Sequence, residues 1–84
     1  MTTPIQQVIH RLLSKQLRRR LAWVTPSTRL VEDLGFELLD QVNLVWQLEK
    51  TYQIIIPDPE IDDLRTVQDV VTCVQSHLVH YVLS

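Results

Sequence analysis

Hydrophobic residues recur at helical spacing in four stretches of the chain, and turn-forming residues separate these stretches. The first stretch covers residues 4–19, where Ile5, Val8, Ile9 and Leu12 follow one another at steps of three and four. This spacing places the four side chains on one face of a helix. The sequence therefore begins with a predicted amphipathic helix.

Both ends of this first stretch carry signals for helix termini. Thr3 can cap the helix, and Pro4 suits the first helical position because its missing N–H costs nothing there. Arg18, Arg19 and Arg20 stand at the other end, where cations favour the negative end of the helix dipole. These signals support a helix that ends near residue 19.

Residues 21–36 form a predicted connection, which is long for a link between two helices. It contains Pro26 and the only glycine of the chain, Gly35, for which we expect a backbone conformation that residues with a Cβ avoid. Its large apolar residues predict that the connection packs onto the helices; these are Trp23, Leu30, Leu34 and Phe36.

The second stretch predicts a helix over residues 38–52, and two prolines mark the break that follows it. The three isoleucines at 54–56 are interpreted as an extended connector that fills the core. Asp58 is predicted to cap a short helix over residues 59–64.

The last helix is predicted to start at Thr66, because Thr66 and Asp69 have the spacing of a capping box. Its buried stripe is expected to comprise Val67, Val70, Val71, Val74, Leu78 and Tyr81. The sequence thus predicts an all-α fold: a small four-helix bundle with a long loop between helices one and two and a short third helix.

Length and composition are consistent with a single domain over residues 1–84 that buries one core, since 45% of the residues are hydrophobic. No apolar run is long enough to span a bilayer, and the start of the chain lacks the pattern of a secretory signal. The single cysteine cannot form an internal disulfide. We therefore expect a cytoplasmic location.

Charge is unevenly distributed along the chain: residues 1–31 carry six basic residues and no acid, whereas residues 32–84 carry ten acids and two basic residues. The two halves could attract each other on folding, or the basic half could bind an anionic partner. No aromatic residue interleaves with the arginines at 18–20, so nucleic acid is not the expected partner.

Residues 32–40 read Glu-Asp-Leu-Gly-Phe-Glu-Leu-Leu-Asp, which resembles the Asp-Leu-Gly-x-Asp-Ser-Leu-Asp loop of acyl carrier proteins. The resemblance covers nearly the whole chain. It continues upstream at 24–30 and downstream at Val42, Leu44, Val45, Leu48, Glu49, Tyr52, Ile56-Pro57-Asp58 and Thr66-Val67. It implies the acyl-carrier-type helical bundle.

One position departs from the family pattern in a way that changes the chemistry. The resemblance implies that the serine of the loop carries 4′-phosphopantetheine, and Leu38 occupies that position here. A leucine has no oxygen for a phosphodiester, and Glu37, Leu39 and Asp40 have no hydroxyl either. We therefore expect no cofactor.

The second helix is apolar on two sides. Leu44, Val45 and Leu48 serve the core by the family pattern, and a second set recurs elsewhere on the helix: Leu38, Leu39, Val42 and Trp46. In one interpretation Trp46 folds over an edge of the bundle. In the other, the second set is an exposed ridge that binds a protein partner, with a polar rim of Glu37, Asp40 and Glu49.

Cys73, His77 and His80 follow one another at i, i+4 and i+7, and these are metal-capable side chains. No matching fourth ligand is apparent, so no metal site is expected. The sequence has no Ser–His–Asp arrangement and no glycine-rich phosphate loop, so we do not expect an enzyme.

Three functions remain open from sequence. The first is a non-catalytic protein-interaction module linked to acyl, lipid or polyketide biosynthesis, which binds enzymes that recognise acyl carriers or a second copy of itself. The second is a genuine acyl carrier whose serine has been replaced by Leu38. The third is a protein that binds an acyl chain without a covalent tether. No partner among nucleic acids or membranes is expected.

Overall fold

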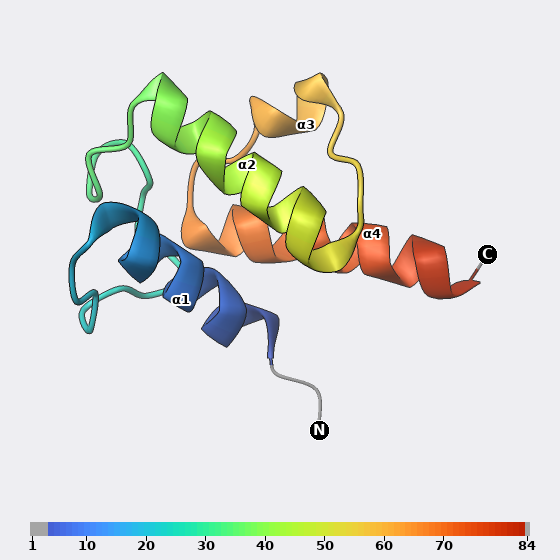
Figure 1. Ribbon diagram of the computed structural model, residues 1–84, viewed down its shortest axis with the longest axis horizontal. Coiled ribbons are helices and arrows are strands. Elements are labelled where there is room, and N and C mark those ends of the chain that lie inside the picture. Colours follow the sequence, from blue (N-terminus) through green and yellow to red (C-terminus); the bar gives the residue numbers. More distant parts are fainter. Residues whose placement is uncertain (1–3, 84) are drawn as a thin grey trace.

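The computed structural model describes residues 4–83, and it describes side chains as far as Leu78. It contains four helices, α1 (Ile5–Leu17), α2 (Leu38–Tyr52), α3 (Asp58–Ile61) and α4 (Val67–Leu83), in the predicted order (Figure 1). The expectations for Thr3, His80 and Tyr81 lie outside the described residues. Within 4–83, no helix is both long enough and apolar enough to cross a membrane.

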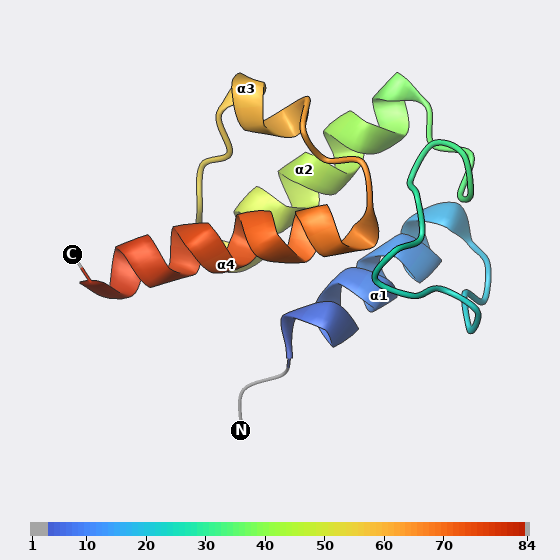
Figure 2. The same cartoon turned by 180° about the vertical axis from the view of Figure 1, so that it is seen from behind.

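The three long helices pack against one another: α1 contacts α2 and α4, and α2 contacts α4. The front and back views show α3 beside α2 and α4 (Figures 1 and 2). The long connection lies at the opposite end of the molecule from the C-terminus. The three long helices and the connection between α1 and α2 contribute buried side chains to one core, whereas α3 contributes none. The core comprises Ile9, Leu13, Leu21, Leu30, Leu34, Phe36, Leu44, Val45, Leu48, Ile56, Leu64, Val67, Val70, Val71, Cys73 and Val74.

The helix ends follow local chemistry. α2 begins and ends at the predicted residues. α1 ends two residues earlier than predicted, because Arg18 adopts a left-handed conformation (φ 54°) and its N–H donates to the Ser14 carbonyl. The predicted capping box of α4 is confirmed: Asp69 N–H donates to Thr66 Oγ1 at 3.1 Å, and Thr66 N–H donates to the Asp69 carboxylate at 3.0 Å.

Three local predictions are wrong. Asp58 does not cap α3 but is its first residue, and the helix ends at Ile61 rather than at residue 64. Extended Pro57 precedes the helix, and its carbonyl accepts the first intrahelical bonds. Trp23 does not pack onto the bundle but is 53% exposed. In the isoleucine connector, Ile56 is buried whereas Ile55 is exposed, because neighbouring residues of an extended segment point in opposite directions.

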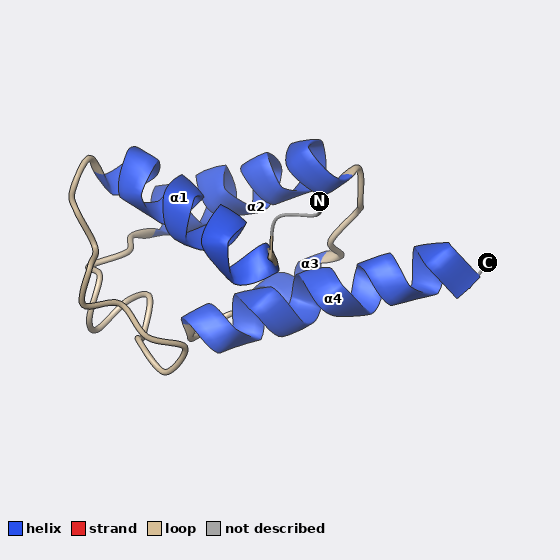
Figure 3. Ribbon diagram, turned by 90° about the horizontal axis from the view of Figure 1, so that it is seen from below, coloured by secondary structure: helices blue, strands red, loops and turns tan. Residues whose placement is uncertain are grey.

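The long connection is anchored to the start of α4 by backbone hydrogen bonds. Leu30 N–H donates to the Arg65 carbonyl at 2.9 Å, and Val67 N–H donates to the Thr28 carbonyl at 3.0 Å. Gln68 N–H donates a third hydrogen bond, to the Pro26 carbonyl at 2.8 Å. These partners explain how sixteen residues without a helix keep a fixed path, which Figure 3 shows as the loops at one end of the bundle.

Gly35 adopts a φ of +71°, as the sequence predicts, and nothing lies within 4 Å of the place where a Cβ would sit. We expect Gly35→Ala to lower the free energy of unfolding by about 1 kcal/mol, since only the left-handed backbone opposes the new methyl group. Gly35→Asn should lose less, because asparagine tolerates this conformation. Urea unfolding of both variants tests this, and an equal loss in the two would contradict it.

Candidate partner-binding site on the second helix

A tight turn leads the chain into α2. The Asp33 carboxylate accepts a hydrogen bond from the Arg29 backbone N–H at 2.8 Å and pairs with the Arg29 guanidinium at 3.0 Å. This hydrogen-bonded pairing lowers the pKa of Asp33 below its ordinary value. Leu34 and Phe36 are buried on either side of Gly35. Polar residues of the motif thus close the turn, and its apolar residues anchor the turn to the core.

The start of α2 presents leucines to solvent. Glu37 is the N-cap residue, and its backbone N–H donates to the Asp40 carboxylate at 2.9 Å. Leu38 is the first residue of the helix and is 77% exposed. The sequence contains no serine, threonine or tyrosine from Arg29 to Lys50. The N-terminus of α2 therefore offers no hydroxyl to which a phosphopantetheine group could be esterified, and the residues here do not fit that group.

The four apolar residues of the predicted ridge all lie on the surface. Leu39 is 69% exposed, Val42 52% and Trp46 58%, in line with Leu38 along one side of α2. The core-facing residues Leu44, Val45 and Leu48 are buried, as predicted. The interpretation in which Trp46 folds over an edge of the bundle does not agree with this exposure. We call Leu38, Leu39, Val42 and Trp46 the apolar ridge.

Two acids of the predicted rim also hold the backbone. Asp40 bonds the N-cap of α2, and the Glu49 carboxylate accepts a hydrogen bond from Ile56 N–H at 2.9 Å. Glu37 is exposed at the end of the ridge. These backbone roles were not predicted from the sequence, although the three-residue spacing of Glu37 and Asp40 is that of a capping box. A partner would therefore contact two carboxylates, those of Asp40 and Glu49, whose positions are fixed by backbone hydrogen bonds.

Two further features lie beside the ridge, and only the first, an i,i+4 pair on α2, could have been found from the sequence. Lys50 Nζ lies 5.6 Å from the centre of the Trp46 ring, within the range of a cation–π contact. A recess of about 220 Å³ lies next to Leu38, and it is bounded by Leu30, Val31, Phe36, Glu37, Gln41 and Leu64. The recess depends on Leu64, which follows α3, so its formation requires the tertiary fold.

Comparison with known proteins shows to which family this chain belongs. The phosphopantetheine attachment site family matches residues 7–74. The acyl carrier protein of Onion yellows phytoplasma is 43% identical over 63 residues, which cover 75% of this chain and 83% of that protein. The chain belongs to the acyl carrier protein family.

Solved structures of acyl carrier proteins have the same fold. The protein from Thermotoga maritima superposes with a TM-score of 0.80 at 27% identity, covering 89% of this chain and 87% of that one. The holo acyl carrier protein of Geobacter metallireducens gives a TM-score of 0.81 at 20% identity, covering 95% and 92%. The predicted all-α, acyl-carrier-type bundle is confirmed.

Membership of this family also bears on activity. Acyl carrier proteins are non-catalytic carriers, so the prediction that the chain is not an enzyme is confirmed. The assignment of partner binding to the apolar ridge and its acidic rim stays a prediction.

Proposed function

We propose that this protein is an acyl-carrier-derived interaction module that carries no prosthetic group. In this proposal Leu38 stands at the position of the attachment serine, and the protein serves acyl, lipid or polyketide biosynthesis in the cytoplasm by docking rather than by carrying. The observation that carries the proposal is the 77% exposure of Leu38 at the first position of α2. A carrier would present its reactive hydroxyl there, and this chain presents a hydrocarbon surface.

The apolar ridge has the composition of a protein interface. Four large apolar side chains along one side of a helix form a surface that monomeric soluble proteins rarely leave unused. Enclosing a side chain such as Leu38 in an interface would contribute about 1.5–3 kcal/mol. Glu37, Asp40 and Glu49 border this apolar centre with charge, which is the usual arrangement at an interface.

The family points to the partner. Enzymes that recognise acyl carriers approach the second helix, so we propose that such an enzyme, or another copy of this chain, covers the ridge. A second copy would form a symmetric dimer in which the same residues meet across a two-fold axis. Because the rim is acidic, a complementary docking face on the enzyme must carry basic groups around an apolar centre.

The alternative, an acyl chain bound without a tether, is favoured by one observation, a recess between α1, the long connection and α4. This recess has a volume of about 580 Å³, and the surface that lines it is mostly apolar although several of its residues are polar. Pockets for hydrocarbon chains have such apolar linings. We retain the docking function as the first proposal because no residue of α2 lines this recess, so an acyl chain held there would leave the exposed apolar ridge unexplained.

Matched variants test the apolar ridge. We expect Leu38→Asp and Trp46→Ala to abolish recovery of acyl-biosynthesis enzymes in pull-downs from the native host, or to abolish self-association in sedimentation. Aspartate is favourable in the first turn of a helix, so Leu38→Asp should leave the fold intact. The readouts are identification of the recovered proteins by mass spectrometry and the sedimentation coefficient.

The chain supplies a control for each variant. Ile55 is 79% exposed and Trp23 is 53% exposed, and both lie outside the ridge. Ile55→Asp and Trp23→Ala therefore change similar side chains at similar exposure and should bind like the wild type. Equal recovery and equal sedimentation for all four variants would refute the proposed function.

A further inference from the structure

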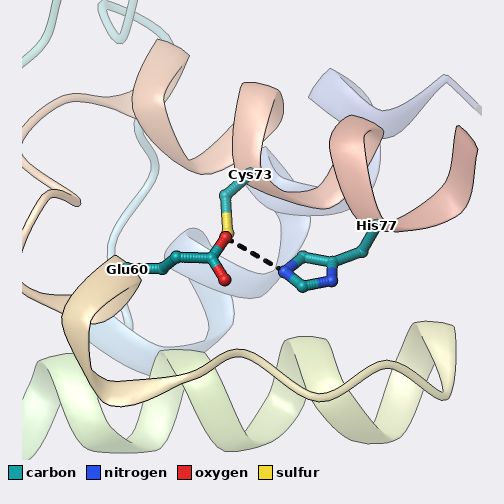
Figure 4. Close-up of side chains that lie close together, drawn as sticks. All are labelled: Glu60, Cys73 and His77. Atoms are coloured by element: carbon teal, nitrogen blue, oxygen red, sulfur yellow. Dashed lines mark hydrogen bonds and ion pairs between the residues drawn. The ribbon is translucent and has the colours of Figure 1, made fainter. Parts of the chain in front are cut away.

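Three metal-capable side chains from two helices converge on one point away from α2. Glu60 comes from α3, and Cys73 and His77 come from α4 (Figure 4). Glu60 Oε1 lies 3.1 Å from His77 Nε2 and 3.9 Å from Cys73 Sγ. All three ligand atoms lie within 4.8 Å of one another. A single carboxylate oxygen thus faces both an imidazole nitrogen and a thiol sulfur.

We propose that this cluster is a binding site for a borderline-soft divalent metal ion, with Zn²⁺ as the preferred ion. Glu60 Oε1, Cys73 Sγ and His77 Nε2 would be the three protein ligands, and a water molecule would take the fourth position. Carboxylate, thiolate and imidazole are all ligands that zinc uses in proteins. The proposal is independent of the function proposed for the apolar ridge.

The distances suit a tetrahedral ion. Zinc bonds of the usual lengths at tetrahedral angles put neighbouring ligand atoms about 3.3–3.7 Å apart. The separations of Glu60 Oε1 from His77 Nε2 and Cys73 Sγ, 3.1 and 3.9 Å, bracket this range. Cys73 Sγ and His77 Nε2 lie within 4.8 Å of each other, so these two side chains would draw together by up to about 1 Å to seat an ion. Cys73 and His77 are four residues apart on a helix, which fixes their side chains on the same face.

The charges of the bound state suit a divalent ion. Burial, together with the nearby charge of Glu60, raises the pKa of the Cys73 thiol, so the ion must displace a proton from the sulfur and binding weakens as the pH falls. The proton leaves to solvent as the metal–sulfur bond forms. The bound thiolate and the Glu60 carboxylate then balance the two positive charges of the ion, and the imidazole remains neutral. The half-buried site would carry no net charge.

Space for the fourth ligand adjoins the cluster. A recess of about 270 Å³ is lined by Glu60, Asp63, Leu64, Asp69, Thr72, Cys73 and Ser76. A water molecule occupies about 30 Å³ in the liquid, so the recess has room for a metal-bound water and its neighbours. The acids and hydroxyls of the lining would accept or donate hydrogen bonds to that water.

A metal ion at this cluster would link α3 to α4, and α3 is the shortest helix of the fold. α3 is a single turn, Asp58–Ile61, that contributes no buried side chain. Without an ion, the contacts of Glu60 with Cys73 and His77 are the side-chain hydrogen bonds that join this turn to α4 among the described residues. Glu60 could not be predicted as a ligand from sequence, because its approach to α4 is set by the path of residues 53–66.

Cobalt titration tests the site directly, because the chain has one cysteine. Addition of Co²⁺ to the reduced full-length protein should produce a thiolate-to-cobalt charge-transfer band that saturates at one ion per chain, and Zn²⁺ should displace it. The band must vanish in Cys73→Ala. Glu60→Gln and His77→Gln should each weaken Co²⁺ binding by more than about 100-fold, beyond the roughly 10–100-fold that loss of an outer hydrogen-bond partner costs.

Two variants serve as controls. Glu32→Gln removes an exposed acid that pairs with Arg29, and His10→Gln removes a histidine whose Nε2 lies 2.7 Å from the Leu21 carbonyl. Both should bind Co²⁺ like the wild type. Far-ultraviolet circular dichroism confirms that every variant is folded, so that weaker binding reports the loss of a ligand.

Thermal unfolding gives a second readout. With Zn²⁺ at about 100 times its dissociation constant, linkage predicts that the Tm of the wild type rises by about 10–20 °C over a sample in chelator. Cys73→Ala should show no such rise. The proposal is overturned if no charge-transfer band forms, if the band survives unchanged in both Glu60→Gln and His77→Gln, or if it saturates at one ion per two chains.

Discussion

The intact mass of this protein should not change when it is incubated with coenzyme A and a broad-specificity phosphopantetheinyl transferase. Attachment of the arm requires a hydroxyl oxygen at the start of α2, and the sequence has none between Arg29 and Lys50. Leu38 is well exposed, so access is not the obstacle. Intact-mass spectrometry checks this, and a gain of one phosphopantetheine group in the wild type would contradict it.

The variant Leu38→Ser should gain that group, because the turn of Asp33 and Gly35 and the cap formed by Asp40 already frame the position. The matched control is Leu39→Ser, which offers a hydroxyl of similar exposure one residue further on and should stay unmodified. Modification of both serines, or of Leu39→Ser alone, would show that Leu38 is not the attachment position. Failure of both would show that the altered helix surface also blocks the transferase.

Truncation of the core side of α2 should cause the largest loss of stability. Leu44 and Leu48 are 0% exposed, so alanine at either position removes buried hydrocarbon and leaves a cavity. We expect a loss of about 2–5 kcal/mol for each. A domain of this length has about 4–12 kcal/mol in total, so either variant should lose a large fraction of its stability.

Urea unfolding followed by circular dichroism measures this loss, and the ridge supplies the control. Val42→Ala shortens an apolar side chain of the same helix that is 52% exposed, and it should change the free energy of unfolding by less than about 0.5 kcal/mol. If Val42→Ala costs as much as Leu48→Ala, the two faces of α2 have been assigned wrongly.

The second helix shows how far sequence reasoning reaches. Its bounds at Leu38 and Tyr52 and its buried face follow from the spacing of apolar residues combined with the motif that precedes it. The same spacing identified the residues of the ridge but left open whether Trp46 is exposed or folds over an edge of the bundle. The capping box at Thr66 and the left-handed Gly35 were equally accessible, because each depends on residues close together in the sequence. Local chemistry determines these features.

The predictions that failed depend on distant parts of the chain. Trp23 was expected to pack the long connection onto the helices because it is large and apolar, yet nearby Leu21 is buried and the Trp23 side chain is 53% exposed. Asp58 lies between two prolines, and the sequence did not settle which one precedes the helix. Glu60 meets Cys73 and His77 only through tertiary packing. Side chains brought together by the path of a loop leave no periodic trace in the sequence.

The backbone bonds between the long connection and residues 65–68 have a consequence for the order of events during synthesis. Leu30 and Thr28 find their partners more than thirty residues later, at Arg65 and Val67. When α1 and α2 have emerged from the ribosome, the connection that joins them therefore still lacks its hydrogen-bond partners at residues 65–68. The connection and the apolar side chains that it buries should become ordered only after the first turn of α4 has emerged, so the packing of α1 and α2 should be completed only with α4.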